Sequence, residues 1–361
     1  MKPFAITTFT FLIVLTVPSF SFAAPSPDLV TIYESRADLQ AAFSGPTYQA
    51  VQGSAAGFLI DVEDWARQYG WKSYAELKEY APSVIPAQPS SALNNPQPPF
   101  VSSSNYIVID DASGEILAAG NADREWPIAS ITKLMTIKTA FEAGVDPYAI
   151  ASVRTQDDVG GAKLAVTDGT TFSLRDLLYA TLVGSANNAA NAVARQSGLS
   201  KEDFVERMNM NAAIMNLPRT RFVDPTGIEL GNVSTAREVA FFAREAFLQE
   251  NIRRMTGTSV ARIAALNDAV YVRDIKNTNW LLYDAAYDDV YVTAGKTGFL
   301  DESKWNLVVR MHPMGESENK SVLVVVMGAE GRRESFDDAH SLATWAWENF
   351  DWDRNVSIAS E

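Results

Sequence analysis

The chain has 361 residues, enough for one large domain with an extension or for two domains, and 47% of them are hydrophobic, which can build a substantial core. Its formal net charge of −14 makes nucleic acid an unfavourable partner, because an acidic chain repels phosphate backbones. The absence of cysteine excludes disulfides, thiolate metal sites and a cysteine nucleophile. The two histidines, His312 and His340, are too few for a multi-histidine metal site, and we expect both to be structural or surface residues.

The first 25 residues, MKPFAITTFTFLIVLTVPSFSFAAP, have the form of an export signal. Lys2 supplies a positive start, residues 4–17 form an apolar run, and residues 21–23 supply a small-x-small cleavage site. We predict a signal peptide over residues 1–23. Retention as a membrane anchor is the alternative, but the run is short for a span. The mature protein is then expected in the periplasm or the extracytoplasmic cell envelope, and no second apolar run suggests a membrane span.

Two segments precede the main domain. Residues 28–85 are expected to form a small helical module of unknown role, because Val62, Trp65 and Tyr69 share one helical face. Those aromatic side chains fit a core or a docking face better than a ligand-gripping surface. Residues 86–104 are rich in Pro, Ser, Asn and Gln, which favours an extended linker before a domain at 105–351.

The rest of the chain predicts strands at both ends of a helical region. A β-hairpin is expected over residues 106–120, a helix over 128–143, a mainly helical region over 151–285, strands at 289–299, 305–313 and 321–330, and a closing helix from Ser335, its candidate cap, to residue 350. The late strands have short connections, which favours antiparallel order. Strands from both ends are therefore expected to complete one sheet.

The stretch WPIASITKLMT, residues 126–136, places Ser130 and Lys133 one helical turn apart among apolar neighbours. A buried lysine tends to lose its proton, because desolvation penalises the charged form. A neutral lysine can accept a proton from a serine hydroxyl, and a helix N-terminus favours developing negative charge. This turn is therefore a candidate source of a nucleophile, a base and part of an oxyanion hole.

Spacing alone does not decide this, since Ser317 and Lys320 have the same spacing in a polar turn. Two further motifs strengthen the catalytic interpretation. Ser185-Ala186-Asn187 stands between apolar helical stretches, where an interhelical turn with capping residues is the alternative. Lys296-Thr297-Gly298 ends an apolar strand, where a surface lysine is the alternative.

Ser-x-x-Lys, Ser-x-Asn and Lys-Thr-Gly in this order form the constellation of the penicillin-interacting serine enzymes. From Asn105 to Asp351 the sequence resembles the D-alanyl-D-alanine carboxypeptidase family, the low-molecular-mass penicillin-binding proteins. The resemblance extends to RTRFVDPTGIELGNVSTAREVA, NTNWLL and NLVVRM. It implies an α/β fold with an antiparallel β-sheet flanked by helices and an all-helical subdomain, as in β-lactamases and transpeptidases.

The resemblance also implies roles for the motif residues. Ser130 would be acylated by the penultimate D-alanine carbonyl, with Lys133 as the base and Ser185 relaying a proton to the leaving amine. Asn187 would hold the substrate amide, and Lys296 and Thr297 the terminal carboxylate, on a substrate-binding strand that includes Gly298 and Phe299. The backbone N–H groups of Ser130 and Phe299 would form the oxyanion hole. No metal or cofactor is implied. The expected partners are peptidoglycan stem peptides, with β-lactam antibiotics as inhibitors.

The sequence departs from the family after the third motif. Ser303 and Lys304 stand where the family often has an Ala-Gly pair, so substrate preference is open between carboxypeptidase and D,D-endopeptidase action. The short stretch after the closing helix resembles the endopeptidase members. Two further alternatives are a serine β-lactamase, for which we find no Glu-x-x-Leu-Asn-type segment, and a non-catalytic cell-wall binding protein, which the retained motif side chains oppose.

Overall fold

The computed structural model describes residues 96–352. The predicted signal peptide at 1–23, the helical module at 28–85 and the first part of the linker lie outside these residues. The end of the linker, residues 96–104, contains no helix or strand. No helix within residues 96–352 combines the length and apolar character needed to cross a membrane.

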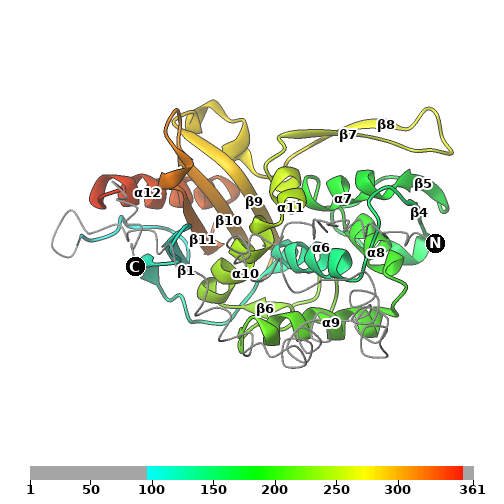
Figure 1. The fold of residues 1–361 in the computed structure, drawn as a ribbon, viewed down its shortest axis with the longest axis horizontal. Coiled ribbons are helices and arrows are strands. Elements are labelled where there is room, and N and C mark those ends of the chain that lie inside the picture. Colours follow the sequence, from blue (N-terminus) through cyan, green and yellow to red (C-terminus); the bar gives the residue numbers. More distant parts are fainter. Residues whose placement is uncertain (1–95, 353–361) are drawn as a thin grey trace, which may run out of the picture.

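Five antiparallel strands form the main sheet, in the order β2-β1-β11-β10-β9 (Figure 1). Their bounds are β1 (Asn105–Asp110), β2 (Ile116–Gly120), β9 (Val290–Leu300), β10 (Lys304–Pro313) and β11 (Val322–Ala329). Pairing of β1 with β11 joins the two ends of the domain, with Asn105 opposite Met327. The predicted strands and their antiparallel order are confirmed, and β9 is an edge strand of this sheet.

The sheet is buried on both faces, so β11 is buried at every position. One face packs on α12 (Arg332–Asn349), and the other packs on the helical region. Alternate residues divide between the two cores: Val108, Leu307, Val309, Val324 and Val326 face α12, and Ile107, Ile109, Val308, Leu323 and Val325 face the helical region.

The closing helix begins earlier than predicted. Gly331 precedes its first residue, Arg332, and the hydroxyl of Ser335 donates to the Arg332 carbonyl within the helix at 2.7 Å. Ser335 is therefore not the cap, and that prediction is wrong, because the helix already has one turn before it.

The helical region contains six α-helices and three pairs of short strands within the described residues. The helices are α6 (Thr132–Glu142), α7 (Leu174–Leu182), α8 (Asn187–Gln196), α9 (Lys201–Ile214), α10 (Ala236–Leu248) and α11 (Glu250–Thr256). The strand pairs are β3 (Trp126–Pro127) with β6 (Val233–Ser234), β4 (Ile150–Val153) with β5 (Thr170–Ser173), and β7 (Val260–Ala264) with β8 (Val272–Lys276). The expected all-helical subdomain thus carries small two-stranded sheets, and the β7–β8 hairpin projects from it as an arm (Figure 1). The α/β fold class holds.

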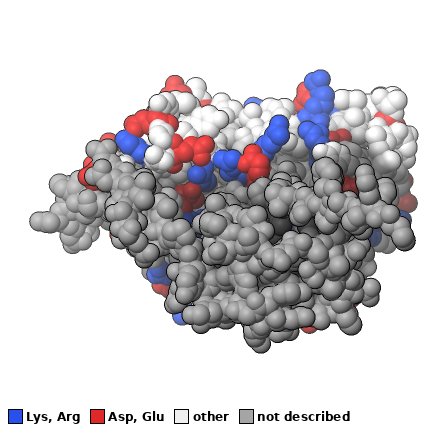
Figure 2. Space-filling model, in the orientation of Figure 1, with Lys and Arg blue, Asp and Glu red and all other residues white. Residues whose placement is uncertain are grey.

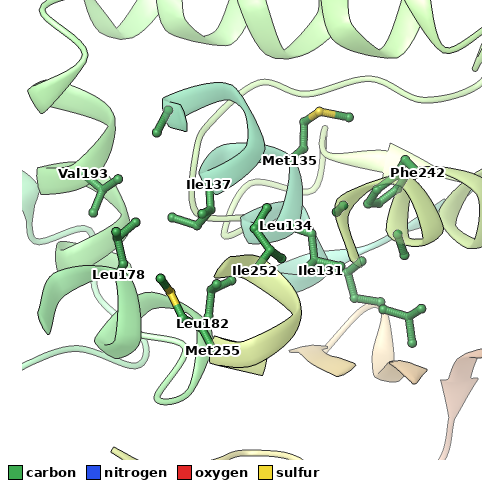
Figure 3. Packing of buried hydrophobic residues seen from close by; sticks show 14 of the residues in the cluster. Ile131, Leu134, Met135, Ile137, Leu178, Leu182, Val193, Phe242, Ile252 and Met255 are labelled. Carbon is green, nitrogen blue, oxygen red and sulfur yellow. The ribbon is translucent and has the colours of Figure 1, made fainter. Parts of the chain in front are cut away.

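A short helix, α6 (Thr132–Glu142), lies at the centre of the helical region, after a 3₁₀ turn at Ala129–Ile131. Figure 3 shows its apolar side chains surrounded by residues of α7, α8, α10 and α11. This packing accounts for the burial of α6 on nearly all sides, as its sequence predicts. The lysine of the first motif is therefore carried by a helix that is buried on nearly all sides, and the serine lies in the 3₁₀ turn that precedes it.

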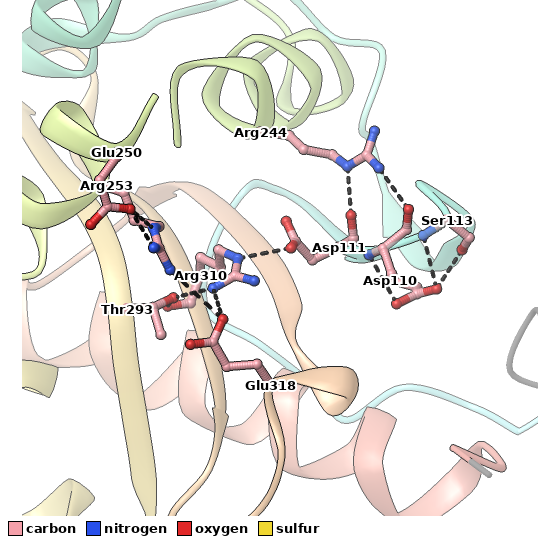
Figure 4. Close-up of polar contacts among 10 residues, drawn as sticks. Asp110, Asp111, Ser113, Arg244, Glu250, Arg253, Thr293, Arg310 and Glu318 are labelled. Atoms are coloured by element: carbon pink, nitrogen blue, oxygen red, sulfur yellow. Dashed lines mark hydrogen bonds and ion pairs between the residues drawn. The ribbon is translucent and has the colours of Figure 1, made fainter. Parts of the chain in front are cut away.

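Polar contacts hold the β1–β2 turn against the sheet (Figure 4). Arg310 of β10 forms an ion pair with Asp111 at 2.8 Å, and Arg244 of α10 donates to the Asp111 carbonyl at 2.6 Å. Figure 2 shows one face of the described surface, on which basic and acidic side chains lie side by side. This part of the surface therefore carries no continuous basic area.

Candidate active site

The first motif brings a hydroxyl and an amine into contact in a closed environment. Lys133 has no exposed surface, and its Nζ lies 2.8 Å from Ser130 Oγ. Nζ also donates to Asn187 Oδ1 at 2.7 Å and to the Thr226 carbonyl at 2.6 Å. A neutral amine has two N–H bonds and one lone pair. With both N–H bonds used by these oxygens, the lone pair is left for the proton of Ser130.

The surroundings of Lys133 favour the neutral amine. Burial is the largest effect and holds the pKa of Lys133 well below its usual value, and the positive charge of Lys296 lowers it further. The carboxylate of Asp224 acts in the opposite direction. Desolvation dominates, so the arrangement supplies a base that does not first have to lose a strongly held proton.

The Thr226 carbonyl is positioned by a tight loop at Asp224–Gly227. The Asp224 carboxylate accepts backbone N–H bonds from Thr226 at 2.6 Å, Gly227 at 2.9 Å and Glu229 at 3.0 Å. Gly227 has a φ of 82°, and a Cβ there would lie 1.9 Å from the Ala129 carbonyl oxygen. Only a glycine therefore lets this loop reach the residue before Ser130.

In the second motif, the serine contacts Lys296 and the asparagine contacts Lys133. Ser185 follows α7 with a φ of 59°, a left-handed conformation that costs energy for a residue with a side chain, and its Oγ accepts from Lys296 Nζ at 3.0 Å. Asn187 begins α8, and its Nδ2 donates to the Gly160 carbonyl at 2.7 Å. Asn187 thus orients Lys133, in addition to the substrate-holding role predicted for it.

The third motif lies on β9, facing the first two motifs. Lys296 is 1% exposed and sits opposite Val308, on the sheet face toward the helical region. Burial lowers the pKa of Lys296 to about 7, with a smaller contribution from the charge of Arg332. The alternative of a surface lysine is excluded.

Gly298 allows β9 to approach the nucleophile turn closely. A Cβ at Gly298 would lie 2.6 Å from the Ile128 carbonyl oxygen and 3.3 Å from the Ser130 nitrogen. The two backbone segments predicted to donate to an oxyanion, at Ser130 and Phe299, are therefore adjacent. Phe299 itself is 42% exposed and packs on Trp305, with ring centroids 4.3 Å apart.

Comparison with known proteins agrees with this geometry. A family model described as D-alanyl-D-alanine carboxypeptidase matches residues 92–331. The chain belongs to the D-alanyl-D-alanine carboxypeptidase family. It is therefore a serine-type D,D-peptidase, and the family resemblance drawn from the three motifs is confirmed.

Relatives of this peptidase include enzymes of both specificities. A D-alanyl-D-alanine endopeptidase of Haemophilus influenzae is 32% identical over 213 residues, covering 58% of this chain and 71% of that protein. One of Pseudomonas aeruginosa is 31% identical over 266 residues, covering 73% and 83%. A D-alanyl-D-alanine carboxypeptidase of Bacillus subtilis is 28% identical over 265 residues, covering 70% and 65%.

Solved structures share the fold of the peptidase. The Streptomyces K15 DD-transpeptidase superposes with a TM-score of 0.64 at 22% identity, covering 70% of this chain and all of that one. Penicillin-binding protein D2 of Listeria monocytogenes, in its cefotaxime-bound form, gives 0.60 at 24% identity and covers 70% and 100%. At these identities the likeness concerns the fold alone.

Two residues beside the third motif were missed by the sequence reasoning. Thr297 Oγ1 donates to Thr278 Oγ1 at 2.6 Å, and Arg332 donates to the Thr278 carbonyl at 2.8 Å. The Arg332 guanidinium also lies 5.4 Å from the Trp305 ring centroid. Thr278 falls within the quoted NTNWLL segment, but nothing in the sequence indicates that Arg332, 54 residues later, reaches it.

The structure also locates Lys304, where the sequence departs from the family, and the two histidines. Lys304 has a φ of 55°, so the peptidase keeps at this position a backbone conformation that suits the family's glycine, but with a lysine in it. His312 is buried in β10, and His340 pairs with Asp289. Among residues 96–352, no three His, Asp or Glu side chains are grouped to hold a metal ion.

Proposed function

We propose that this peptidase cleaves D-alanyl bonds of peptidoglycan through an ester intermediate on Ser130. The contact between Lys133 Nζ and Ser130 Oγ, 2.8 Å long and without exposed lysine surface, is the observation that carries the proposal. A serine hydroxyl is a weak nucleophile unless a base accepts its proton as it attacks. Lys133 meets the geometric and the electrostatic requirement for that base.

The proposed reaction has two steps. In the first, Ser130 Oγ bonds to the penultimate D-alanine carbonyl carbon while its proton passes to Lys133, and the backbone N–H groups of Ser130 and Phe299 stabilise the oxyanion. The carbon–nitrogen bond then breaks, and the leaving amine receives a proton through Ser185, which Lys296 holds at 3.0 Å. In the second, water attacks the ester, releases the acid and restores the serine. Lys296 and Thr297 bind the carboxylate of the leaving residue.

Endopeptidase action on D-alanyl cross-links is the specificity we propose. Three of the relatives, at 31–32% identity, are named D-alanyl-D-alanine endopeptidases, whereas the named carboxypeptidases are 26–28% identical. We further propose that residues 1–23 export the chain to the periplasm, where this substrate lies. Penicillin would enter the same site and remain as a slowly hydrolysed ester.

Labelling with a fluorescent penicillin tests the site. The full chain should become stably labelled, and Ser130→Ala should abolish the label. Ser317→Ala is the matched control, because Ser317 belongs to the second Ser-x-x-Lys spacing, in an exposed turn, and it should label normally. A folded protein that takes no label would refute acyl-enzyme formation, and rapid penicillin hydrolysis without lasting label would make it a β-lactamase.

Digestion of purified muropeptides tests the specificity. Conversion of cross-linked dimers to monomers is expected, and Ser130→Ala should not perform it. Removal of only the terminal D-alanine from pentapeptides would instead make the protein a carboxypeptidase. A labelled enzyme that cleaves neither substrate would contradict the proposed bond specificity.

A further inference from the structure

A hollow of about 520 Å³ lies next to the third motif and is lined in part by the start of α12. It is lined by residues that join β8 to the 3₁₀ turn at Trp280–Leu282 and by the first two residues of α12. Thr278 belongs to its wall and accepts a hydrogen bond from Thr297 at 2.6 Å. The hollow therefore adjoins Thr297, one of the two residues proposed to bind the carboxylate.

The walls of the hollow are cationic, in contrast to the chain as a whole. Lys276, Arg332 and Arg333 line it together with a single carboxylate, that of Asp284. Asp284 pairs with Arg333 at 3.1 Å, which leaves Lys276 and Arg332 without a carboxylate partner among residues 96–352. In a chain of formal net charge −14, two such cations side by side mark a place suited to an anionic ligand.

Aromatic rings hold these cations in place. Lys276 Nζ lies 4.3 Å from the Tyr283 ring centroid, and the Arg332 guanidinium lies 4.5 Å from that of Trp280. Trp280 is itself stacked on Phe336 of α12 at 5.4 Å. Arg332 and the floor beneath it are therefore fixed before a ligand arrives, which lowers the entropic cost of binding.

The size of the hollow bears on the leaving group. A carboxypeptidase releases a single D-alanine, which ends at its carboxylate and carries a methyl group, so it would leave most of this volume empty. A cross-link releases an amine that belongs to a second stem peptide, with a longer chain and further carboxylates. The hollow has the charge and the room for that larger group.

We propose that this hollow is the subsite for the leaving stem peptide of a cross-link, with Lys276 binding a second carboxylate beyond the one held at Thr297. This inference rests on the proposed D,D-peptidase function and specifies which group lies on the leaving side of the bond. Lys276 acts as a specificity-determining residue and takes no part in bond cleavage.

Charge variants of Lys276 in the full chain test the subsite with three readouts: cleavage of a cross-linked muropeptide dimer, removal of D-alanine from a pentapeptide, and acylation by fluorescent penicillin. Lys276→Gln should lower kcat/KM for the dimer by about fivefold to tenfold, mostly through KM, because one charge-assisted contact is lost. Lys276→Glu should lower it further, and Lys276→Arg should restore it. The pentapeptide and penicillin rates should stay unchanged.

Arg262→Gln is the matched control, because Arg262 stands on the same hairpin but outside the hollow. It should leave all three rates unchanged. Unchanged dimer cleavage in Lys276→Glu, or an equal fall of all three rates, would overturn the subsite. A wild-type enzyme that takes the label and trims pentapeptides but leaves dimers intact would also overturn the subsite. That result would still be consistent with acylation at Ser130. Failure of the wild type to take any label would instead count against the proposed function itself.

Discussion

At the scale of single residues, the site depends on two buried lysines, and the charge of one lowers the proton affinity of the other. Lys133 faces Ser130, Lys296 faces Ser185, and the charge of Lys296 lowers the pKa of Lys133. Each side chain gives up hydration on burial, which is unfavourable for an ammonium and favourable for a base. Burial of the two lysines thus lowers the stability of the fold and raises the reactivity of the site.

The pH dependence of acylation follows from this pair. The reaction needs neutral Lys133, so the rate should fall as pH drops through the pKa of Lys133, which lies well below that of a free lysine. Lys296→Met removes a neighbouring positive charge, so the pKa of Lys133 should rise and the acidic limb should move to higher pH. Rates of penicillin labelling between about pH 5 and pH 10 measure the limb.

The control for the pH experiment is Lys320→Met, which removes an equal charge from the exposed turn of the second Ser-x-x-Lys spacing. Its acidic limb should coincide with that of the wild type. A limb in the wild type at the pKa of an unperturbed lysine, or a shift to lower pH in Lys296→Met, would contradict a neutral Lys133 base.

At the scale of elements, three backbone segments converge on Ser130: the 3₁₀ turn before α6, the loop at Asp224–Gly227 and strand β9. Ala129 has a φ of 49°, and Gly227 and Gly298 both lie against residues 128–130. Strain and close approach are concentrated here, as is usual for active sites whose surroundings enforce an unusual conformation.

Gly227→Ala should therefore disturb the site and the fold together. The added Cβ meets the Ala129 carbonyl oxygen at 1.9 Å, and the φ of 82° is unfavourable for alanine. We expect a loss of about 2–3 kcal/mol in the free energy of unfolding and a fall in penicillin acylation of at least about tenfold. Urea unfolding and labelling rates measure the two effects.

Gly315→Ala is the control that separates the cost of an unfavourable φ from the effect of a steric clash. Its φ of 77° is equally unfavourable, but no atom lies within 4 Å of the added Cβ. It should cost about 1 kcal/mol and leave acylation unchanged. Equal acylation losses in the two variants would show that the contact with Ala129 does not position Ser130.

Lys304 has a left-handed backbone conformation, so here a change to glycine should stabilise the protein. Lys304→Gly should raise the free energy of unfolding by about 0.5–1 kcal/mol, because glycine adopts a φ of 55° without strain. Lys304→Ala removes the same charge but keeps the conformational cost, so thermal unfolding should show no comparable gain. A larger gain in the alanine variant would attribute the effect to charge.

The sequence predicted the elements with long continuous or periodic apolar runs and missed the short paired strands of the helical region. Strands β9, β10 and β11 and helices α6, α7 and α10 carry continuous or periodic apolar residues, and all were predicted. In β8, four of five residues are exposed and none is fully buried, so periodicity gives no signal for it. Hairpins of this kind are fixed by cross-strand pairing that a linear pattern does not contain.

The site was predictable as far as side-chain motifs describe it. Ser130, Lys133, Ser185, Asn187 and Lys296 are brought together as their motifs suggest. The Thr226 contact to Lys133 uses a backbone carbonyl, which any residue possesses, so no residue type reveals it. The approach of Arg332 to Thr278 is tertiary and depends on where α12 begins.

At the scale of the whole molecule, one buried carboxylate joins the start of the described chain to its last helix. Asp338 of α12 is 8% exposed and accepts bonds from the backbone and hydroxyl groups of both Ser102 and Ser103, at 2.6–3.0 Å. The segment before β1 is thereby fixed against the face of the sheet opposite Ser130.

Asp338→Ala should weaken the fold without changing the chemistry. The loss of several charge-assisted hydrogen bonds should lower the free energy of unfolding by about 2–4 kcal/mol in urea titration, while penicillin acylation of the folded protein stays normal. Glu348→Ala, at an exposed position of the same helix, should change stability by less than about 0.5 kcal/mol. A fall in acylation in Asp338→Ala would instead link this contact to the site.

The 3.0 Å contact between Lys296 and Ser185 crosses the boundary between the sheet and the helical region. One packed core joins the sheet to the helical region and keeps them aligned, and hydrogen bonds tolerate changes of only a few tenths of an ångström. A slide of one layer past the other by about an ångström would part the two side chains while both layers kept their helices and strands. Activity therefore depends on the relative position of the two layers. On gentle heating, penicillin acylation should be lost at a lower temperature than the helices and strands.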